Sequence, residues 1–308
     1  MSNISTDRLN EITTYTAVYG KDKSALYFGI TLESLNRYIR KARIESDIEK
    51  KPNILIFDIE TAPVQSYVWS LWKQNIYIDQ IESDWFMLSW SAKWLFETEI
   101  YSDVLTPKEA LAEDDSRIAK GIWEFIDKAD IIIGHNIAGF DIPKLNTRWI
   151  VNGLQPPSPY QMVDTLKEAK RHFLFSSNKL DFIARILGTE MKMDAGGFET
   201  WIGCLKGDAD SLKHMETYNR KDINVSEEVY VKIRPWIKAH PNLALYYQDD
   251  MHRCRNCGST NLKFDKGFYV TPLNKYSTVR CECGAIGRVR KTALTKNKSA
   301  GLFQQCPR

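Results

Sequence analysis

A short apolar segment that ends in two carboxylates constrains the fold of this chain most strongly. Four apolar residues, Ile54–Phe57, precede Asp58-Ile59-Glu60. The partly β-branched run predicts a buried strand. Side chains two apart on a strand point to the same face, so Asp58 and Glu60 should lie side by side at its end. If the pair is buried, it requires raised pKa values or a multivalent cation; at an exposed strand end it requires neither.

The segments that follow predict an α/β fold. Alternating aromatic and polar residues over 85–101 predict antiparallel strands, and the apolar run 129–134 predicts a second buried strand. Amphipathic patterns predict helices over 115–128, 141–152, 164–172, 178–187 and 208–234. This order predicts a mixed sheet flanked by helices. Five tryptophans in this region are expected in the core rather than on a base-stacking surface: Trp69, Trp72, Trp85, Trp90 and Trp94.

The charge is distributed unevenly along the 308 residues. The net charge is only +3, but residues 251–308 carry 12 basic and 2 acidic residues, whereas residues 52–250 carry 21 and 30. A basic end beside an acidic centre predicts that the end contacts a polyanion while the centre concentrates cations. The alternative is a solvated basic surface. No apolar run approaches the roughly 20 residues that span a bilayer, and the N-terminus lacks a basic region followed by an apolar stretch, so we expect no membrane association and a cytoplasmic location.

Four of the six cysteines cluster near the C-terminus. Cys254 and Cys257, then Cys281 and Cys283, form two pairs that are each followed by glycine. Such pairs resemble zinc-ribbon knuckles, and four thiolates can hold one structural Zn²⁺ in a closed tetrahedral site. His252 and Cys306 are reserve ligands. Basic residues of this segment are candidates for phosphate contacts, among them Lys263, Arg288 and Arg290.

The N-terminal segment has mostly helical spacing of apolar residues, interrupted at Gly29. Residues 22–43 resemble a helix-turn-helix, and a small helical cap that binds a protein partner is the alternative. Five polar residues would face outward: Ser34, Asn36, Arg37, Arg40 and Arg43. We therefore predict three parts: a helix-turn-helix-like module over 1–50, an α/β domain over 51–240 and a zinc ribbon over 250–308.

Two further motifs place acidic residues near the first pair. Gly134-His135-Asn136 ends the second buried strand, and Phe140-Asp141 begins the helix after it. Tyr218 and Asp222 lie four apart in a helical pattern, so they share one helix face.

Together the three motifs resemble those of the DEDD family of 3′–5′ exonucleases, over about residues 52–238. The tyrosine of the third motif resembles the tyrosine-bearing branch, which includes the proofreading domains of DNA polymerases. The whole arrangement is similar to phage or bacterial DEDD exonucleases that lack a polymerase domain. The resemblance implies a ribonuclease H-like fold.

The resemblance also implies a mechanism and a set of site residues. Water attacks the terminal phosphodiester in line, with two Mg²⁺ or Mn²⁺ ions held by four carboxylates: Asp58, Glu60, Asp141 and Asp222. Asp58 would bridge the ions, Tyr218 would orient the water, and Asn136 and Phe140 would lie near the terminal nucleotide. The expected substrate is single-stranded DNA rather than RNA. We expect the chain to act in replication or repair, where a replication or repair protein is a possible partner.

Two other functions remain open. The same fold could carry a structure-selective endonuclease or a ribonuclease. The flanking modules could instead belong to a DNA-binding protein without catalysis, against which the intact acidic set argues.

Overall fold

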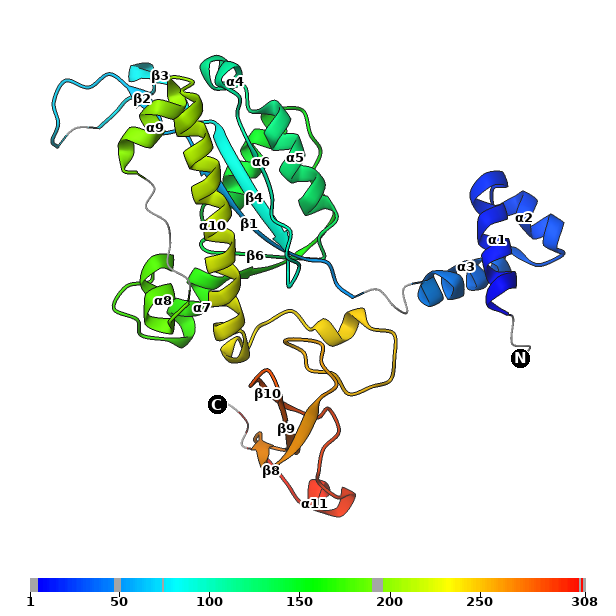
Figure 1. The fold of residues 1–308 in the computed structure, drawn as a ribbon. Helices are drawn as coiled ribbons and strands as arrows, with labels where there is room; N and C mark the ends of the chain where they lie inside the picture. Colours follow the sequence, from blue (N-terminus) through cyan, green and yellow to red (C-terminus); the bar gives the residue numbers. More distant parts are fainter. Residues whose placement is uncertain (1–4, 47–50, 74, 190–195, 305, 307–308) are drawn as a thin grey trace. The chain divides into compact units, whose positions relative to one another are not determined.

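The computed structural model describes residues 5–46, 51–73, 75–189, 196–304 and 306 (Figure 1). The chain divides into two compact units. One comprises 52–241 with 283–286, and the other comprises 1–51, 242–282 and 287–308. The three-part division at 1–50, 51–240 and 250–308 stays a prediction. Among the described residues, no helix has the length and apolar character to cross a membrane.

The larger unit is built on a five-stranded mixed sheet in the order β5-β4-β1-β6-β7. β1 pairs antiparallel with β4 and parallel with β6; β5 is antiparallel to β4, and β7 is parallel to β6. The strands span Ile54–Thr61 (β1), Met87–Trp94 (β4), Tyr101–Val104 (β5), Ile131–Gly134 (β6) and Gln161–Asp164 (β7). The predicted mixed sheet is confirmed.

Helices cover both faces of this sheet, which explains why β4 is buried along nearly its whole length. On one face of β4, Trp90 packs on Phe125 of helix α5 (Ser116–Asp127). On the other face, the Nζ of Lys93 lies 2.5 Å from the Glu227 carboxylate on helix α10 (Ala209–Ile233). The helices are α4 (Pro107–Ala112), α5 (Ser116–Asp127), α6 (Asp141–Val151), α7 (Thr165–His172), α8 (Leu180–Leu187), α9 (Phe198–Leu205) and α10 (Ala209–Ile233).

The tryptophans divide between core and surface. Trp90 is buried, and Trp94 packs against the core from a partly buried position. The prediction of a core position is wrong for Trp69 and Trp72, which are 96% and 81% exposed. Both belong to the loop between two short strands, β2 (Gln65–Ser66) and β3 (Ile81–Ser83), that form a separate two-stranded sheet. The loop also contains the short 3₁₀ helix η1 (Ile78–Gln80).

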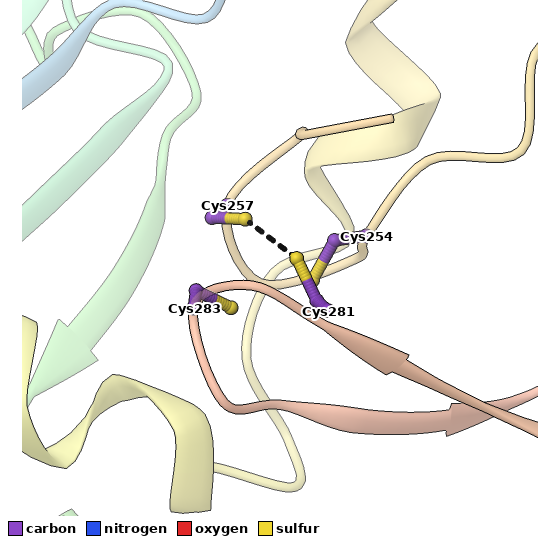
Figure 2. A group of neighbouring side chains, drawn as sticks. All are labelled: Cys254, Cys257, Cys281 and Cys283. Atoms are coloured by element: carbon purple, nitrogen blue, oxygen red, sulfur yellow. Dashed lines mark hydrogen bonds between the residues drawn. The ribbon is translucent and has the colours of Figure 1, made fainter. Parts of the chain in front are cut away.

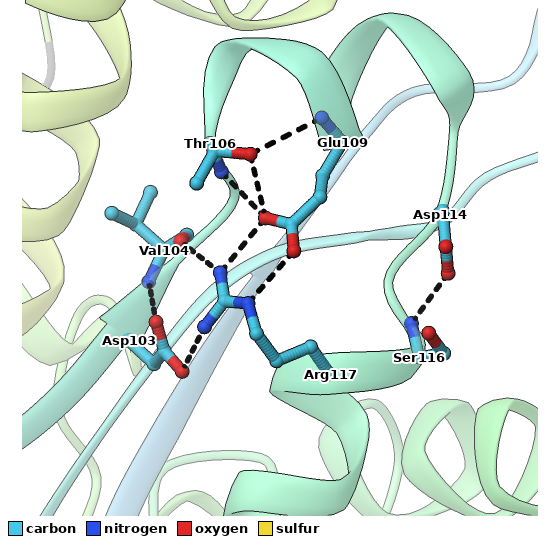
Figure 3. A network of polar contacts seen from close by, with 7 residues as sticks. All are labelled: Asp103, Val104, Thr106, Glu109, Asp114, Ser116 and Arg117. Carbon is cyan, nitrogen blue, oxygen red and sulfur yellow. Dashed lines mark hydrogen bonds and ion pairs between the residues drawn. The ribbon is translucent and has the colours of Figure 1, made fainter.

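A network around Arg117 ties α4 and α5 to the end of β5 (Figure 3). Its guanidinium donates to Glu109 at 2.7 and 2.8 Å, to Asp103 at 2.5 Å and to the carbonyl of Val104 at 3.0 Å. Glu109 also accepts a hydrogen bond from the Thr106 amide at 2.8 Å, which completes the N-terminal capping box of α4. The hydrogen bond from Arg117 lowers the pKa of Glu109 to about 2.

We expect the Glu109→Gln variant to be less stable than the wild type by about 1 kcal/mol at pH 7, the range for an ion-pair network at a surface. Because the pKa of Glu109 is lower in the folded chain, its contribution is present above pH 4.5 and disappears as the pH falls toward 2. The two chains should therefore converge in acid. Urea unfolding at pH 7, 4 and 2.5 measures this, and a constant difference across that range would contradict it.

The N-terminal segment forms three helices, α1 (Thr6–Tyr19), α2 (Lys21–Phe28) and α3 (Leu32–Ser46). Ile12, Ala25 and Leu35 form its core. Gly29 ends α2 in the left-handed conformation, where the sequence predicts the interruption. Asn36 and Arg37 are exposed and Ser34 is half-buried, whereas the side chains of Arg40 and Arg43 lie outside the described residues. DNA binding by this segment stays a prediction.

The C-terminal segment contains a three-stranded sheet in the order β10-β9-β8, in which β8 and β9 pair antiparallel. The long pair β8 (Leu262–Val270) and β9 (Lys275–Cys281) forms a hairpin, β10 spans Ile286–Arg288, and helix α11 spans Lys296–Ala300. Two 3₁₀ helices, η2 (Arg234–Trp236) and η3 (Leu243–Tyr246), lie in the connection from α10.

Candidate active site

Three carboxylates from two distant parts of the sequence meet at the end of β1. Asp58 and Glu60 lie on β1 and Asp222 on α10, and one ligand atom of each lies within 4.8 Å of the others. Asp222 is buried, and the other two are partly buried. Like charges this close repel unless a proton or a cation compensates them. Hard carboxylate oxygens fit Mg²⁺ or Mn²⁺ better than softer metals, so the donor set suits the predicted ions.

Among the described residues, the acidic cluster does not include Asp141, the fourth predicted ligand. Asp141 lies next to it. It is the first residue of α6, and its Oδ1 accepts a hydrogen bond from the backbone N–H of Ile59 at 3.2 Å. The pairing of β1 with β6 ends at Ile56, so the N–H of Ile59 lies beyond the strand pairing and donates to the Asp141 side chain instead. Ile59 lies between Asp58 and Glu60, and this bond therefore joins α6 to the carboxylate pair. Burial raises the pKa of Asp141 to about 7.

Helix α10 contributes two more side chains. Tyr218, one turn before Asp222, is partly buried against the core of the domain. Asn219 is fully buried, and its Nδ2 donates to the Asp58 carboxylate at 2.8 Å. The sequence analysis missed Asn219, although its position three residues before Asp222 places the two on one helix face. Asn219 thus orients Asp58 from the helix that supplies Asp222.

The loop between β6 and α6 is organised by Asp164 at the end of β7. Its Oδ1 accepts the N–H of Asn136 at 3.1 Å and its Oδ2 accepts the N–H of Ala138 at 3.1 Å. The same carboxylate caps α7. Asn136 has a positive φ of 70°. Gly134 precedes this turn, and a Cβ there would lie 2.8 Å from the carbonyl oxygen of Phe57, so no side chain fits between the strands.

A cavity of about 500 Å³ lies beside Thr61, the residue after Glu60. Its lining includes Trp85, Trp201 and Lys144, with Val64 from the chain that leaves β1. The Nζ of Lys144 donates to Thr61 Oγ1 at 3.0 Å and lies 3.9 Å from the centre of the Trp85 ring.

Lys144 is the second residue that the sequence analysis missed, and burial lowers its pKa. Its Nζ also lies 4.9 Å from the ring of Phe140, which is 39% exposed. Its place three residues after Asp141 on α6 is a sequence signal that could have identified it.

The four C-terminal cysteines form a cluster (Figure 2), with one sulfur of each within 4.8 Å of the others. Cys257 and Cys281 sulfurs lie 3.5 Å apart. The glycines after the pairs, Gly258 and Gly284, have positive φ of 75° and 92°, as the tight knuckles require. His252 and Cys306 are not part of the cluster in the described residues. Four thiols in this arrangement are compatible with a zinc ribbon.

The predicted phosphate-binding residues of the same segment, Lys263, Arg288 and Arg290, are exposed. The guanidinium carbon of Arg288 lies 3.9 Å from the ring centre of Tyr276 and 5.5 Å from that of Tyr269. The hairpin therefore presents cations and rings on its surface.

A protein-family match supports the fold. The RNase H superfamily matches residues 96–234, a range that contains Asp141, Tyr218 and Asp222 and begins after Asp58 and Glu60. Among solved structures, the family B DNA polymerase from the hyperthermophilic archaeon Pyrobaculum calidifontis is similar, with 18% identity and a TM-score of 0.46. That match covers 61% of this chain and 25% of the polymerase chain. No curated protein matches.

The sheet of the larger unit and the superfamily match agree with each other. The mixed sheet of the larger unit and its flanking helices therefore have an RNase H-like fold, and the matched residues 96–234 lie within that unit.

Proposed function

We propose that this chain is a metal-dependent 3′–5′ exonuclease that removes nucleotides from single-stranded DNA ends in replication or repair. The observation that carries the proposal is the cluster of Asp58, Glu60 and Asp222 at the end of a buried strand. The Asp141 side chain accepts a hydrogen bond from the backbone N–H between Asp58 and Glu60. An acidic cluster of this kind in an RNase H-like domain fits phosphodiester hydrolysis. The resemblance of the sequence motifs to those of the DEDD family supports the 3′–5′ direction.

Each residue has a distinct task in this proposal. Asp58, Glu60 and Asp222 would hold two Mg²⁺ or Mn²⁺ ions, which when bound activate the attacking water and stabilise the leaving 3′ oxygen. Asp141 would complete the acidic set from α6. Tyr218 would orient the attacking water, because its neutral phenol is a poor ligand for Mg²⁺ and a good hydrogen-bond partner.

End-labelled oligonucleotides test the activity and its direction. A 3′-labelled single strand should release labelled mononucleotide from the first turnover, and a 5′-labelled strand should give a ladder that shortens with time. Internal fragments as the earliest products would identify an endonuclease instead. The same substrates made as RNA, and as duplexes, distinguish DNA from RNA and single-stranded from double-stranded ends.

Replacing Tyr218 with phenylalanine should lower kcat by roughly 10- to 1000-fold, the range for losing one positioned polar group. The Mg²⁺ concentration for half-maximal activity should stay the same, because the phenol orients water and does not bind metal. Tyr160→Phe is the matched control. This half-buried tyrosine precedes Gln161, which pairs with Ile131, the partner of Ile54 at the start of β1, whereas the carboxylates lie toward the end of β1. Full recovery of the Tyr218→Phe variant at higher Mg²⁺ would show that this role is wrong.

The cysteine cluster is proposed to hold one structural Zn²⁺. Plasma mass spectrometry of the purified chain should find one zinc per molecule, and Cys281→Ser should remove it because a closed site requires all four ligands. Cys204→Ser is the control, since Cys204 is buried in the core far from the cluster in sequence. Full zinc occupancy in Cys281→Ser would contradict the assigned ligand set.

A further inference from the structure

The loop between β2 and β3 exposes more aromatic surface than any folding role explains. Trp69 is 96% exposed and Trp72 is 81% exposed, and Tyr67 and Tyr77 are exposed by 68% and 67%. A protein normally shields indole rings or uses them at an interface.

The base of this loop is a defined structure. The Tyr67 N–H donates to the carbonyl of Gln80 at 2.9 Å, and the Gln80 side chain donates back to the carbonyl of Tyr67 at 3.0 Å. The Tyr77 N–H donates to Gln80 Oε1 at 2.8 Å. The two ends of the loop are therefore clamped together, and the rings are carried on a fixed stem.

The loop begins a few residues after the carboxylate pair, next to the cavity that Thr61 lines. β1 ends at Thr61, and four residues of the chain that leaves it, Thr61 through Val64, line the cavity beside Lys144. Only one further residue separates Val64 from Ser66 at the end of β2. The aromatic loop is thus a direct extension of the strand that carries Asp58 and Glu60.

The charge of this segment differs from that of its domain. Residues 52–250 carry nine more acidic than basic residues, a field that repels a polyanion. Residues 61–78 contain one lysine, Lys73, and no acidic residue. A nucleic-acid strand that follows this segment is therefore repelled less than the average charge of residues 52–250 implies.

We infer that the aromatic loop, residues 67–73 and 75–78, is a stacking surface for the single-stranded nucleic acid whose end occupies the carboxylate site. Trp69 and Trp72 stack on bases upstream of the scissile bond, an interaction that tolerates any base because each has a flat π face. The inference rests on the proposed function. The inference names the segment that binds the strand upstream of the cleaved bond. It also explains a preference for single strands, because bases in a duplex are already stacked on one another.

The test measures binding by fluorescence anisotropy in chains that carry Asp58→Asn to prevent cleavage. Trp69→Ala with Trp72→Ala should weaken binding of a labelled dT12 by about tenfold or more, the effect of losing one or two base stacks. Binding of a blunt duplex should change less than twofold. Leu71→Ala, 82% exposed in the same loop, is the control that removes apolar area without a ring. Trp69→Phe with Trp72→Phe should restore most of the affinity.

Other outcomes separate this inference from its rivals and from the proposed function. Equal dT12 affinity of the alanine variant and its parent would overturn the inference, and cleavage by the wild type would then leave the proposed function standing. Equal losses in the Leu71→Ala control would also overturn it. A wild type that self-associates in light scattering, and an alanine variant that is monomeric, would assign the rings to a second copy of the chain instead. Absence of wild-type cleavage in the end-label assay would refute the exonuclease while the binding comparison still decides the loop.

Discussion

Replacing Asp58 with asparagine is expected to reduce phosphodiester cleavage by on the order of 10³-fold, a loss at the upper end of what single positioned groups contribute. The substitution keeps the size of the side chain and removes one of three charges whose ligand atoms lie within 4.8 Å of one another. The fold should persist, because less like-charge repulsion remains at the end of β1. Cleavage of a 3′-labelled oligonucleotide by protein freed of contaminating nuclease measures the effect.

Thermal unfolding with and without Mg²⁺ adds a readout that does not depend on activity. A ligand that binds only the folded state raises Tm, so Mg²⁺ should stabilise the wild type and have a much smaller effect on Asp58→Asn. Glu124→Gln, an exposed acid on α5 outside the cluster, is the control and should behave as the wild type in both measurements. Wild-type cleavage in Asp58→Asn would remove Asp58 from the proposed ligand set.

Neutralising three exposed cations of the C-terminal segment should weaken binding of long single strands most strongly at low salt. The chain for this test carries Lys263→Gln, Lys266→Gln and Arg290→Gln, and leaves Arg288 in its contact with the tyrosines. Each neutralised phosphate contributes roughly 0.7 to the slope of log affinity against log salt for single strands, so the slope should flatten by roughly 2 if all three contact phosphates. Titrations at several salt concentrations, with Asp58→Asn present, measure it.

The control variant removes the same number of positive charges from another part of the chain. Three exposed lysines of the RNase H-like domain, replaced by glutamine, provide it: Lys108, Lys120 and Lys128. If the C-terminal segment contacts the strand, only the first set flattens the slope. Equal slopes in both variants and the parent would point to a protein partner for this segment.

Local periodicity was sufficient to predict which residues share a face, and this explains why part of the site could be read from the sequence. Asp58 and Glu60 follow from the two-residue repeat of a strand, and Tyr218 and Asp222 from the four-residue spacing of a helix. That β1 and α10 bring these residues together was implied only by the resemblance to the DEDD exonucleases, because no spacing rule within one strand or one helix relates the two elements.

Spacing could not identify contacts that depend on how elements cross. The hydrogen bond from Asn219 to Asp58 joins residues 161 positions apart, and no rule for one helix or one strand contains it. The prediction that Trp69 and Trp72 lie in the core was wrong for a related reason. An aromatic run resembles a core strand in composition, and only the short length of β2 and β3, which stand outside the main sheet, leaves the rings at the surface.

Asp164 has a consequence for how this domain can diverge. Its carboxylate accepts four backbone N–H groups, those of Asn136 and Ala138 in the loop before α6 and those of Leu166 and Lys167 at the start of α7. The loop that leads to Asp141 is thus fixed by hydrogen bonds from main-chain N–H groups, which every residue except proline has. If the chain acts as proposed, side chains at the outward positions of this loop can change during evolution, and with them the nucleic-acid end that is accepted, while Asp141 keeps its position.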